Sequence, residues 1–465
     1  MGENPIDQAA QQGSMAADTA TDAVLAGFYS DQRLMWRNVL WITFGHFGMA
    51  LSITIVQPLM NLRLKSIGVS ESTVGLITSI NLWAVSFLVM YFSWKSDHCT
   101  SRMGRRTPFT LISLPFITAA LILFPLFSQK WLLIGLMLIY FFFTDMNAST
   151  YPLLAIDCVS KDVLARVSGL VAITISVAGF LSTRLGATMA DHHETRVFVI
   201  AALVMTSMMS IALWRIKEPP IHHPAKGKFS LMAPIRVACG DKRILVLMIA
   251  VALLNAFPII FKTWVWFYSQ SKLGLTIGDT GVAMSWGLLI QVVVSFPAGW
   301  LIDRFGSYLA LSIQWVLMLS LALCSIHVTN MHGLILLTSL FFLFTPLQVA
   351  GDTILWKTMD KADTGSYTST VALVRNFFTG TVLAISGFII RWTGSYIAAF
   401  WFGFALSSSA LIVFFVYRRL MRTGSMVTDT TDGESGTSLV SAPPAEPSEL
   451  EPQIGGMETS IATAT

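Results

Sequence analysis

The chain has 465 residues, of which 54% are hydrophobic and only 12% are charged. Soluble domains carry about 25% charged residues, so this composition excludes a water-soluble globular protein and favours an integral membrane protein. The formal net charge of +4 is too small to indicate a nucleic-acid partner.

Twelve apolar stretches follow one another along the chain. Each is near the roughly 20 residues that a helix needs to cross about 30 Å of hydrocarbon. Helices are expected because hydrocarbon offers backbone groups no hydrogen-bond partners. The predicted spans are 37–61, 71–94, 107–128, 131–156, 165–188, 195–215, 243–268, 280–301, 307–327, 332–356, 367–390 and 393–417.

The spans and the polar segments between them predict five regions. These are a disordered tail over 1–35, a six-helix bundle over 36–216, a linker over 217–242, a second six-helix bundle over 243–420 and a disordered tail over 421–465. With both termini inside, inner segments carry about three times as many Lys and Arg as outer ones. We therefore expect a multi-pass protein of the plasma (inner) membrane, with both tails and the linker in the cytoplasm.

A short basic loop after the second span has a weaker counterpart after the eighth. The first loop reads S-D-H-C-T-S-R-M-G-R-R-T-P-F over 96–109, and the second reads G-W-L-I-D-R-F-G over 299–306. A loop repeated within twelve spans predicts two homologous halves, as in transporters that rock around a central site. A simpler explanation is that the basic residues only follow the positive-inside rule for cytoplasmic loops. However, Asp and Gly recur at matching places in the two loops.

We predict that these loops form a conformational latch, made in one orientation of the halves and broken in the other. Aspartate can accept helix-end hydrogen bonds and pair with arginine, and glycine permits a tight turn. The latch residues are Asp97, Arg102, Gly104, Arg105, Arg106, Asp303, Arg304 and Gly306.

The loop over 96–109 resembles the signature of the major facilitator superfamily, and its longer form is similar to that of sucrose transporters and related glycoside–cation symporters. The superfamily resemblance covers about residues 36 to 420 in span count, loop and linker. It implies two pseudo-symmetric six-helix bundles with spans one, four, seven and ten lining a cavity. The symporter resemblance rests mostly on one loop and implies uptake of a sugar or glycoside with a proton or sodium ion.

Two departures from that branch bear on the coupling ion and the substrate. The stretch from Tyr151 to Asp157 lacks the arginine that sucrose transporters place before the inner aspartate of span four. Spans one and two hold no carboxylate within the membrane, where melibiose-type symporters bind sodium. A proton is therefore favoured over sodium, and sucrose itself is a doubtful substrate.

Three ionisable residues at membrane depth are the central candidates for binding substrate or ion, because such groups are costly there and usually face a cavity. Asp145 can exchange a proton, Arg375 can donate to sugar hydroxyls or balance Asp145, and His46 can donate and accept. The alternative is a hydrogen-bond network that only holds helices together. Further polar candidates in neighbouring spans are Asn81, Ser149, Asn255, Gln291, Gln348, Asp352 and Asn376.

The seventh span contains a proline, an asparagine and a lysine within its apolar stretch. Asn255 and Lys262 are seven residues apart and so share one face, with Pro258 between them to bend the helix. Lys262 is expected to lie toward the outer surface, where a lysine can extend its ammonium to water.

These features predict a secondary active transporter that performs proton-coupled symport of a sugar or glycoside by alternating access. Its partners would be that small molecule, a proton and the lipid bilayer, without nucleic acid, cofactor or metal ion. Two alternatives are efflux of an amphipathic compound by proton exchange, and a transporter-like receptor or assembly factor without flux. An enzyme is not expected, because the sequence has no metal-ligand cluster, phosphate loop or nucleophile motif.

Overall fold

The computed structural model describes residues 30–101, 103–159, 163–219, 230, 232, 242–358 and 364–431. It forms two compact units, Met1–Phe415 and Val416–Thr465, and the packing described below belongs to the first. Arg102, most of the predicted linker and the outer parts of both predicted tails lie outside the described residues.

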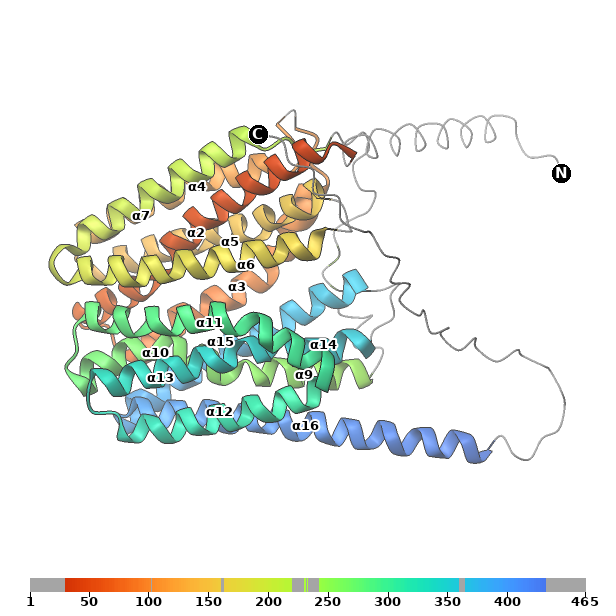
Figure 1. The fold of residues 1–465 in the computed structure, drawn as a ribbon. Coiled ribbons are helices and arrows are strands. Elements are labelled where there is room, and N and C mark those ends of the chain that lie inside the picture. The colour runs from red at the N-terminus through yellow and green to blue at the C-terminus, as the bar shows by residue number, and fades with distance from the viewer. Residues whose placement is uncertain are drawn as a thin grey trace, which may run out of the picture. The chain divides into compact units, whose positions relative to one another are not determined.

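The first half of the large unit is a bundle of helices that run back and forth (Figure 1). Its elements are α2 (Gln32–Ser66), α3 (Glu71–Asp97), α4 (Thr107–Leu123), the 3-10 turn η1 (Phe124–Leu126), α5 (Lys130–Cys158), α6 (Leu164–Leu181), the π-helical turn η2 (Ser182–Gly186) and α7 (Ala187–Arg215). His193 has non-helical φ and ψ of −143° and 58°. The chain reverses there, so residues 187–192 continue α6 and the rest of α7 runs back.

The second half repeats this arrangement with two helices broken near prolines. Its elements are α9 (Lys242–Leu254), α10 (Ala256–Leu273), α11 (Ile277–Phe305), α12 (Ser307–His327), α13 (Met331–Phe344), the 3-10 turn η3 (Thr345–Gln348), α14 (Val349–Thr358), α15 (Thr364–Thr393) and α16 (Tyr396–Thr431). Pro258 has no N–H to donate to Leu254. The hydroxyl of Ser407 covers the break by accepting from Phe257 N–H (3.1 Å) and donating to the Leu254 carbonyl (3.2 Å).

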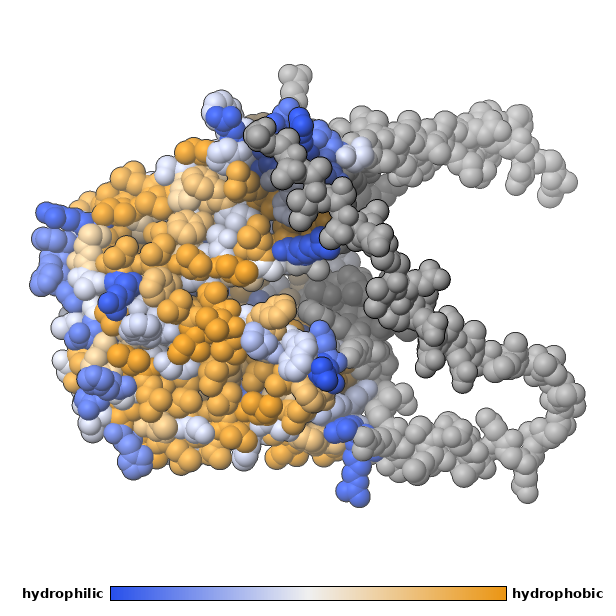
Figure 2. All heavy atoms as spheres, viewed as in Figure 1, coloured by the Kyte–Doolittle hydropathy of each residue, from blue (hydrophilic) through white to orange (hydrophobic). Residues whose placement is uncertain are grey.

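Eleven segments of the described chain are long and apolar enough to cross a membrane. One of them, Arg166–Arg215, contains two spans that meet at His193, so the eleven segments of the described chain supply twelve crossings. On the face shown in Figure 2, apolar side chains cover the helices along their length and hydrophilic ones gather at both ends. The predicted all-α membrane fold of two six-helix bundles is confirmed.

The two halves meet along α3 and α15, and along α11 with α6 and α7. Glycines let the backbones of α3 and α15 approach closely. A Cβ atom on Gly75 would lie 3.3 Å from the Leu383 carbonyl oxygen, and one on Gly387 would lie 2.9 Å from the Glu71 carbonyl oxygen. We call the ends of the helices near the loop 96–109 the inner end, following the predicted orientation, and the opposite ends the outer end. The close approach of α3 and α15 is at the outer end.

Candidate functional site

Asp145 is a buried acidic group within α5. It lies in the middle of α5 and exposes 9% of its surface. Its Oδ2 atom is buried and has no hydrogen-bond partner among the described residues. An ionised carboxylate without a cation beside it is costly in hydrocarbon, so α5 carries a charge that must be compensated by an ion or a proton.

His46 and Ser149 are also buried, but their contacts are local to the first half. The Nδ1 atom of His46 lies 2.9 Å from the Ile42 carbonyl oxygen, and its ring lies 4.7 Å from that of Tyr151. The Tyr151 hydroxyl donates to the same carbonyl at 3.0 Å. The Ser149 hydroxyl donates to the Met146 carbonyl at 2.8 Å. Both candidate side chains are therefore satisfied by neighbours on α2 and α5.

The two charged candidates of the second half, Asp352 and Arg375, lie near each other. Asp352 on α14 and Arg375 on α15 are half-buried and close enough to interact electrostatically. No ion pair among the described residues links Arg375 to Asp145. The structure thus gives Arg375 a neighbouring acid in its own half, and its neighbour Asn376 is half-buried as well.

The remaining candidates lie at breaks or on half-buried faces. Asn255 occupies the break between α9 and α10 and donates to the Val251 carbonyl at 2.8 Å. Gln348 ends η3, and its buried Nε2 atom has no partner within the described chain. Asn81 on α3 and Gln291 on α11 are half-buried. The buried Oδ1 atom of Asn81 likewise has no partner in the described ranges.

The loop after α3 forms an ion-pair network at the inner end of the first half. Arg106 contacts Asp97 (Nη2–Oδ1, 2.5 Å) and Asp157 (Nε–Oδ2, 3.1 Å). Arg105 donates from Nε to Asp157 Oδ2 at 2.9 Å and lies 3.6 Å from Asp97. Burial alone would lower the pKa of the Arg105 guanidinium, but the hydrogen bond and charge of Asp157, with Asp97 and Glu218, raise it above its ordinary value. Arg105 therefore stays charged at any physiological pH.

Glu218, which follows α7, caps the amino end of α4. Its carboxylate accepts the backbone N–H groups of Arg105 (2.7 Å) and Thr107 (2.9 Å) and the Thr107 hydroxyl (2.6 Å). Gly104 has φ of +103°, and a Cβ atom there would collide with this carboxylate. The loop glycine thus provides both the turn and the room for the cap.

The second loop has different contacts, although its sequence resembles the first. Asp303 and Arg304 are exposed at the end of α11, and Gly306 has φ of +88°. The Arg304 guanidinium lies 5.4 Å from the Trp300 ring. In the described part of the chain, no ion pair includes Asp303 or Arg304. The ion pairs of the predicted latch residues therefore lie within the first half.

The two halves are joined at the outer end by charged contacts that the sequence did not predict. The Lys65 ammonium lies 2.5 Å from the Tyr396 hydroxyl and 3.1 Å from Glu71 Oε1. The Asp191 carboxylate accepts the Gly278 N–H at the start of α11, at 3.0 and 3.1 Å to its two oxygens. We call these five residues the outer closure. Tyr396 and Gly278 lie far along the chain from Lys65 and Asp191, so no local pattern reveals these two contacts.

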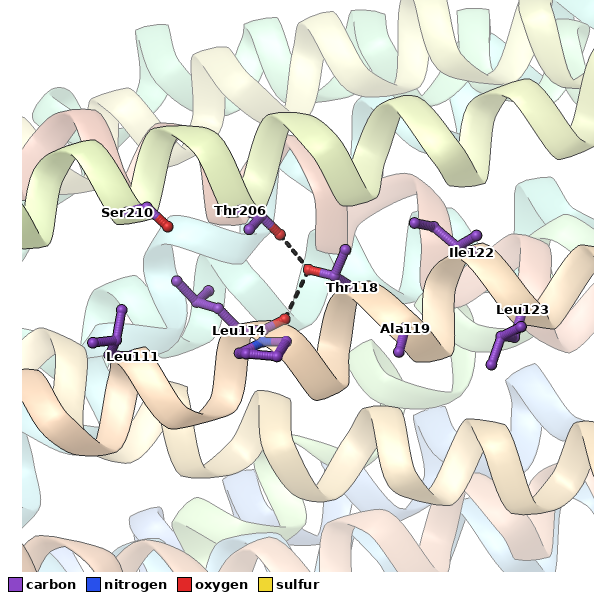
Figure 3. A pocket seen from close by; sticks show the side chains of 9 residues that line it. Leu111, Leu114, Thr118, Ala119, Ile122, Leu123, Thr206 and Ser210 are labelled. Atoms are coloured by element: carbon purple, nitrogen blue, oxygen red, sulfur yellow. Dashed lines mark hydrogen bonds between the residues drawn. The ribbon is translucent and has the colours of Figure 1, made fainter.

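A separate hollow of about 640 Å³ lies between α4 and α7. Figure 3 shows the hydrogen bond between the hydroxyls of Thr118 and Thr206, with the Thr118 hydroxyl also donating to the Leu114 carbonyl. The other lining residues are mostly apolar and come from the first half alone. Because none of the predicted binding residues lines it, this hollow is not the candidate site.

Comparisons with known proteins agree with this geometry. Residues 42–356 match the family model of the Major Facilitator Superfamily. No curated protein sequence matches the chain. Similar solved structures include the nucleoside transporter NupG (TM-score 0.64, 12% identity, covering 83% of this chain and 99% of that one). Another is the peptide transporter POT in complex with sulfate (TM-score 0.65, 13% identity, 83% and 94%).

A third similar structure is a bacterial homologue of the human lysosomal transporter Spinster, in an inward-facing and unoccupied conformation. Its TM-score is 0.61 at 12% identity, and the alignment covers 84% of this chain and 97% of that chain. At such identities these similarities concern the fold alone.

Proposed function

The chain belongs to the Major Facilitator Superfamily, and from this premise we propose that it couples an inward proton gradient to the uptake of a sugar or glycoside. The family and the similar transporter structures support a secondary transporter in a membrane. The sugar class rests on the loop over 96–109, which resembles that of glycoside–cation symporters. The proposal places the protein in the plasma (inner) membrane with both termini in the cytoplasm.

Proton coupling is proposed because the buried carboxyl group of Asp145 has an oxygen without a partner in the described chain. Its side chain lies in the middle of α5, and one carboxyl oxygen has no partner among the described residues. The ion pairs of the first half involve other acids, so nothing in the described chain neutralises it. A proton is the smallest species that removes such a charge, and losing it to the inner side would complete a transport cycle.

Alternating access in this proposal uses the contacts at the two ends of the bundle. The outer closure joins the halves through Lys65–Tyr396 and Asp191–Gly278, whereas the ion pairs of the inner loop stay within the first half. Substrate and proton would together release the outer closure and bring the inner ends together. Binding energy for the substrate then offsets the loss of the charged contacts.

The test is uptake into proteoliposomes under an imposed inward proton gradient, with labelled D-glucose, methyl α-D-glucoside and D-glucuronate. We expect accumulation of at least one sugar above its equilibrium level. Asp145→Asn should reduce accumulation to that level while sugar binding persists. Asp31→Asn is the matched control. Asp31 caps α2 by accepting from the Leu34 N–H, and asparagine caps a helix equally well, so this variant should transport normally.

Three results would contradict the proposal. Loss of sugar from the vesicles in response to the gradient would indicate efflux by proton exchange. Binding without flux would indicate a receptor. Full accumulation by the Asp145→Asn variant would show that this carboxyl does not carry the proton.

A further inference from the structure

Lys262 is an exposed lysine beside deeply buried residues of α10. Its neighbours Phe261, Trp264 and Val265 are buried in the core of the second half, each with 0% exposure. Lys262 itself is exposed among these buried residues. Its surroundings therefore differ from those of the aromatic residues beside it.

The helix α10 lies where the two halves of the protein meet. The helix packs against α2 of the first half and against α11, α13 and α15 of its own. One turn nearer the outer end than Lys262, Trp266 is buried, with 2% exposure. The Lys65 ammonium of α2 lies 5.2 Å from the ring of the adjacent Phe267. Lys262 thus lies just inside the outer closure, where the two halves face each other.

The depth of Lys262 does not fit the expectation that its ammonium extends to the outer surface. The membrane-crossing segment runs from Ile244 to Leu273. At about 1.5 Å per residue, Lys262 lies roughly 16 Å from the outer end of that helix. Its four-carbon stem is too short for that distance.

A cation at this depth requires an anion. No carboxylate among the described residues forms an ion pair with Lys262. In the same half, Asp352 interacts electrostatically with Arg375. Charged side chains inside membrane proteins face a partner or a pathway, because an unpaired charge is costly there. The described chain gives Lys262 no ion-pair partner in this conformation, and a carboxylate on the transported molecule can supply one.

We infer that Lys262 binds a carboxylate of the substrate, and that the transported molecule is an acidic rather than a neutral carbohydrate. This inference rests on the proposed function and adds the charge of the substrate to it. One ammonium matches one carboxylate, and the hydroxyl groups of the sugar would be left to the uncharged polar side chains of the halves. Asn81 and Gln348 each have a buried polar atom without a partner in the described residues and could serve this purpose.

The test compares D-glucuronate with D-glucose, which differ by a carboxylate in place of a hydroxymethyl group. Binding to the purified full chain is measured by ligand-dependent thermal stabilisation at equal ionic strength. Wild-type protein should bind glucuronate about tenfold more tightly than glucose. Lys262→Gln should lose this preference without losing glucose binding, and Lys262→Arg should retain it. Lys272→Gln is the matched control, since Lys272 lies on the same helix and contacts the Tyr268 ring at the outer end.

The outcomes separate this inference from the proposed function. Equal or tighter binding of glucose by wild-type protein, together with gradient-driven glucose uptake, would overturn the acidic substrate and leave sugar symport intact. An unchanged preference in Lys262→Gln would overturn the role of Lys262. Absence of binding and uptake for every sugar would overturn both.

Discussion

Asp157 holds two arginines at the inner end of the first half, and it lies deeper in the protein than the other acid of that network. The side chains of Asp157 and Arg106 expose only 7% and 5% of their surface, whereas that of Asp97 exposes 37%. Asp145 is similarly buried but lacks a cation among the described residues. Two acids of one helix, α5, thus differ in whether the protein itself compensates their charge.

This difference predicts the effect of removing one carboxylate from the network. Asp157→Asn should lower the free energy of unfolding by about 3–5 kcal/mol, because it leaves buried Arg106 with one acid fewer. Asp97→Asn should cost less, about 1 kcal/mol, because water already screens that group. Thermal or denaturant unfolding of the purified variants measures both. Equal losses for the two variants would contradict this account of burial.

At the scale of elements, the outer contact between α3 and α15 depends on residues without side chains. A Cβ atom on Gly387 would lie 2.9 Å from the Glu71 carbonyl oxygen, too close for an unshifted backbone. Gly135 on α5, by contrast, has nothing within 4 Å of the place of its Cβ atom. The same substitution therefore tests close helix packing at one site and helix propensity alone at the other.

Gly387→Ala should loosen the outer end, because the added methyl group separates α15 from α3. We expect backbone hydrogen exchange in residues 71–80 and 383–392 to accelerate on the order of tenfold, equivalent to about 1.4 kcal/mol of local opening. Gly135→Ala should leave the exchange of both segments unchanged. Protection that stays the same in Gly387→Ala would show that the two helices have room to spare.

At the scale of the whole molecule, twelve membrane crossings of the described chain form two bundles whose charged contacts differ at the two ends. The outer closure links the halves through Lys65, Tyr396 and Asp191, whereas the network of Asp157 stays within one half. The loops repeat in sequence, but only the first carries described ion pairs. Pseudo-symmetry of the fold is therefore compatible with asymmetric roles for the halves.

The predicted orientation can be tested directly in intact cells. Epitope tags at the amino and carboxyl ends should both be protected from external protease, and a tag inserted beside Gly274, between α10 and α11, should be cleaved. The excess of Lys and Arg on the predicted inner segments is the physical reason. Cleavage of only one terminal tag would place the termini on opposite sides and contradict an even number of crossings.

The sequence by itself determined the class of the fold, because the membrane acts on local composition. Long apolar stretches must become helices where backbone groups have no other partner, so the spans and the two halves could be predicted without any contact being known. The loop over 96–109 likewise indicated the superfamily through its own residues. The candidate residues at membrane depth could be named for the same reason, since a charge within an apolar stretch is visible in the sequence.

Only the tertiary structure decided which of those residues meet. It placed Asp157 against Arg105 and Arg106, which lie in a different part of the first half, and brought Lys65 to Tyr396. It also showed that Lys262 is exposed although its neighbours on α10 are buried. Partners that are hundreds of residues apart depend on how helices pack and rotate about their axes, and hydropathy carries no information about either.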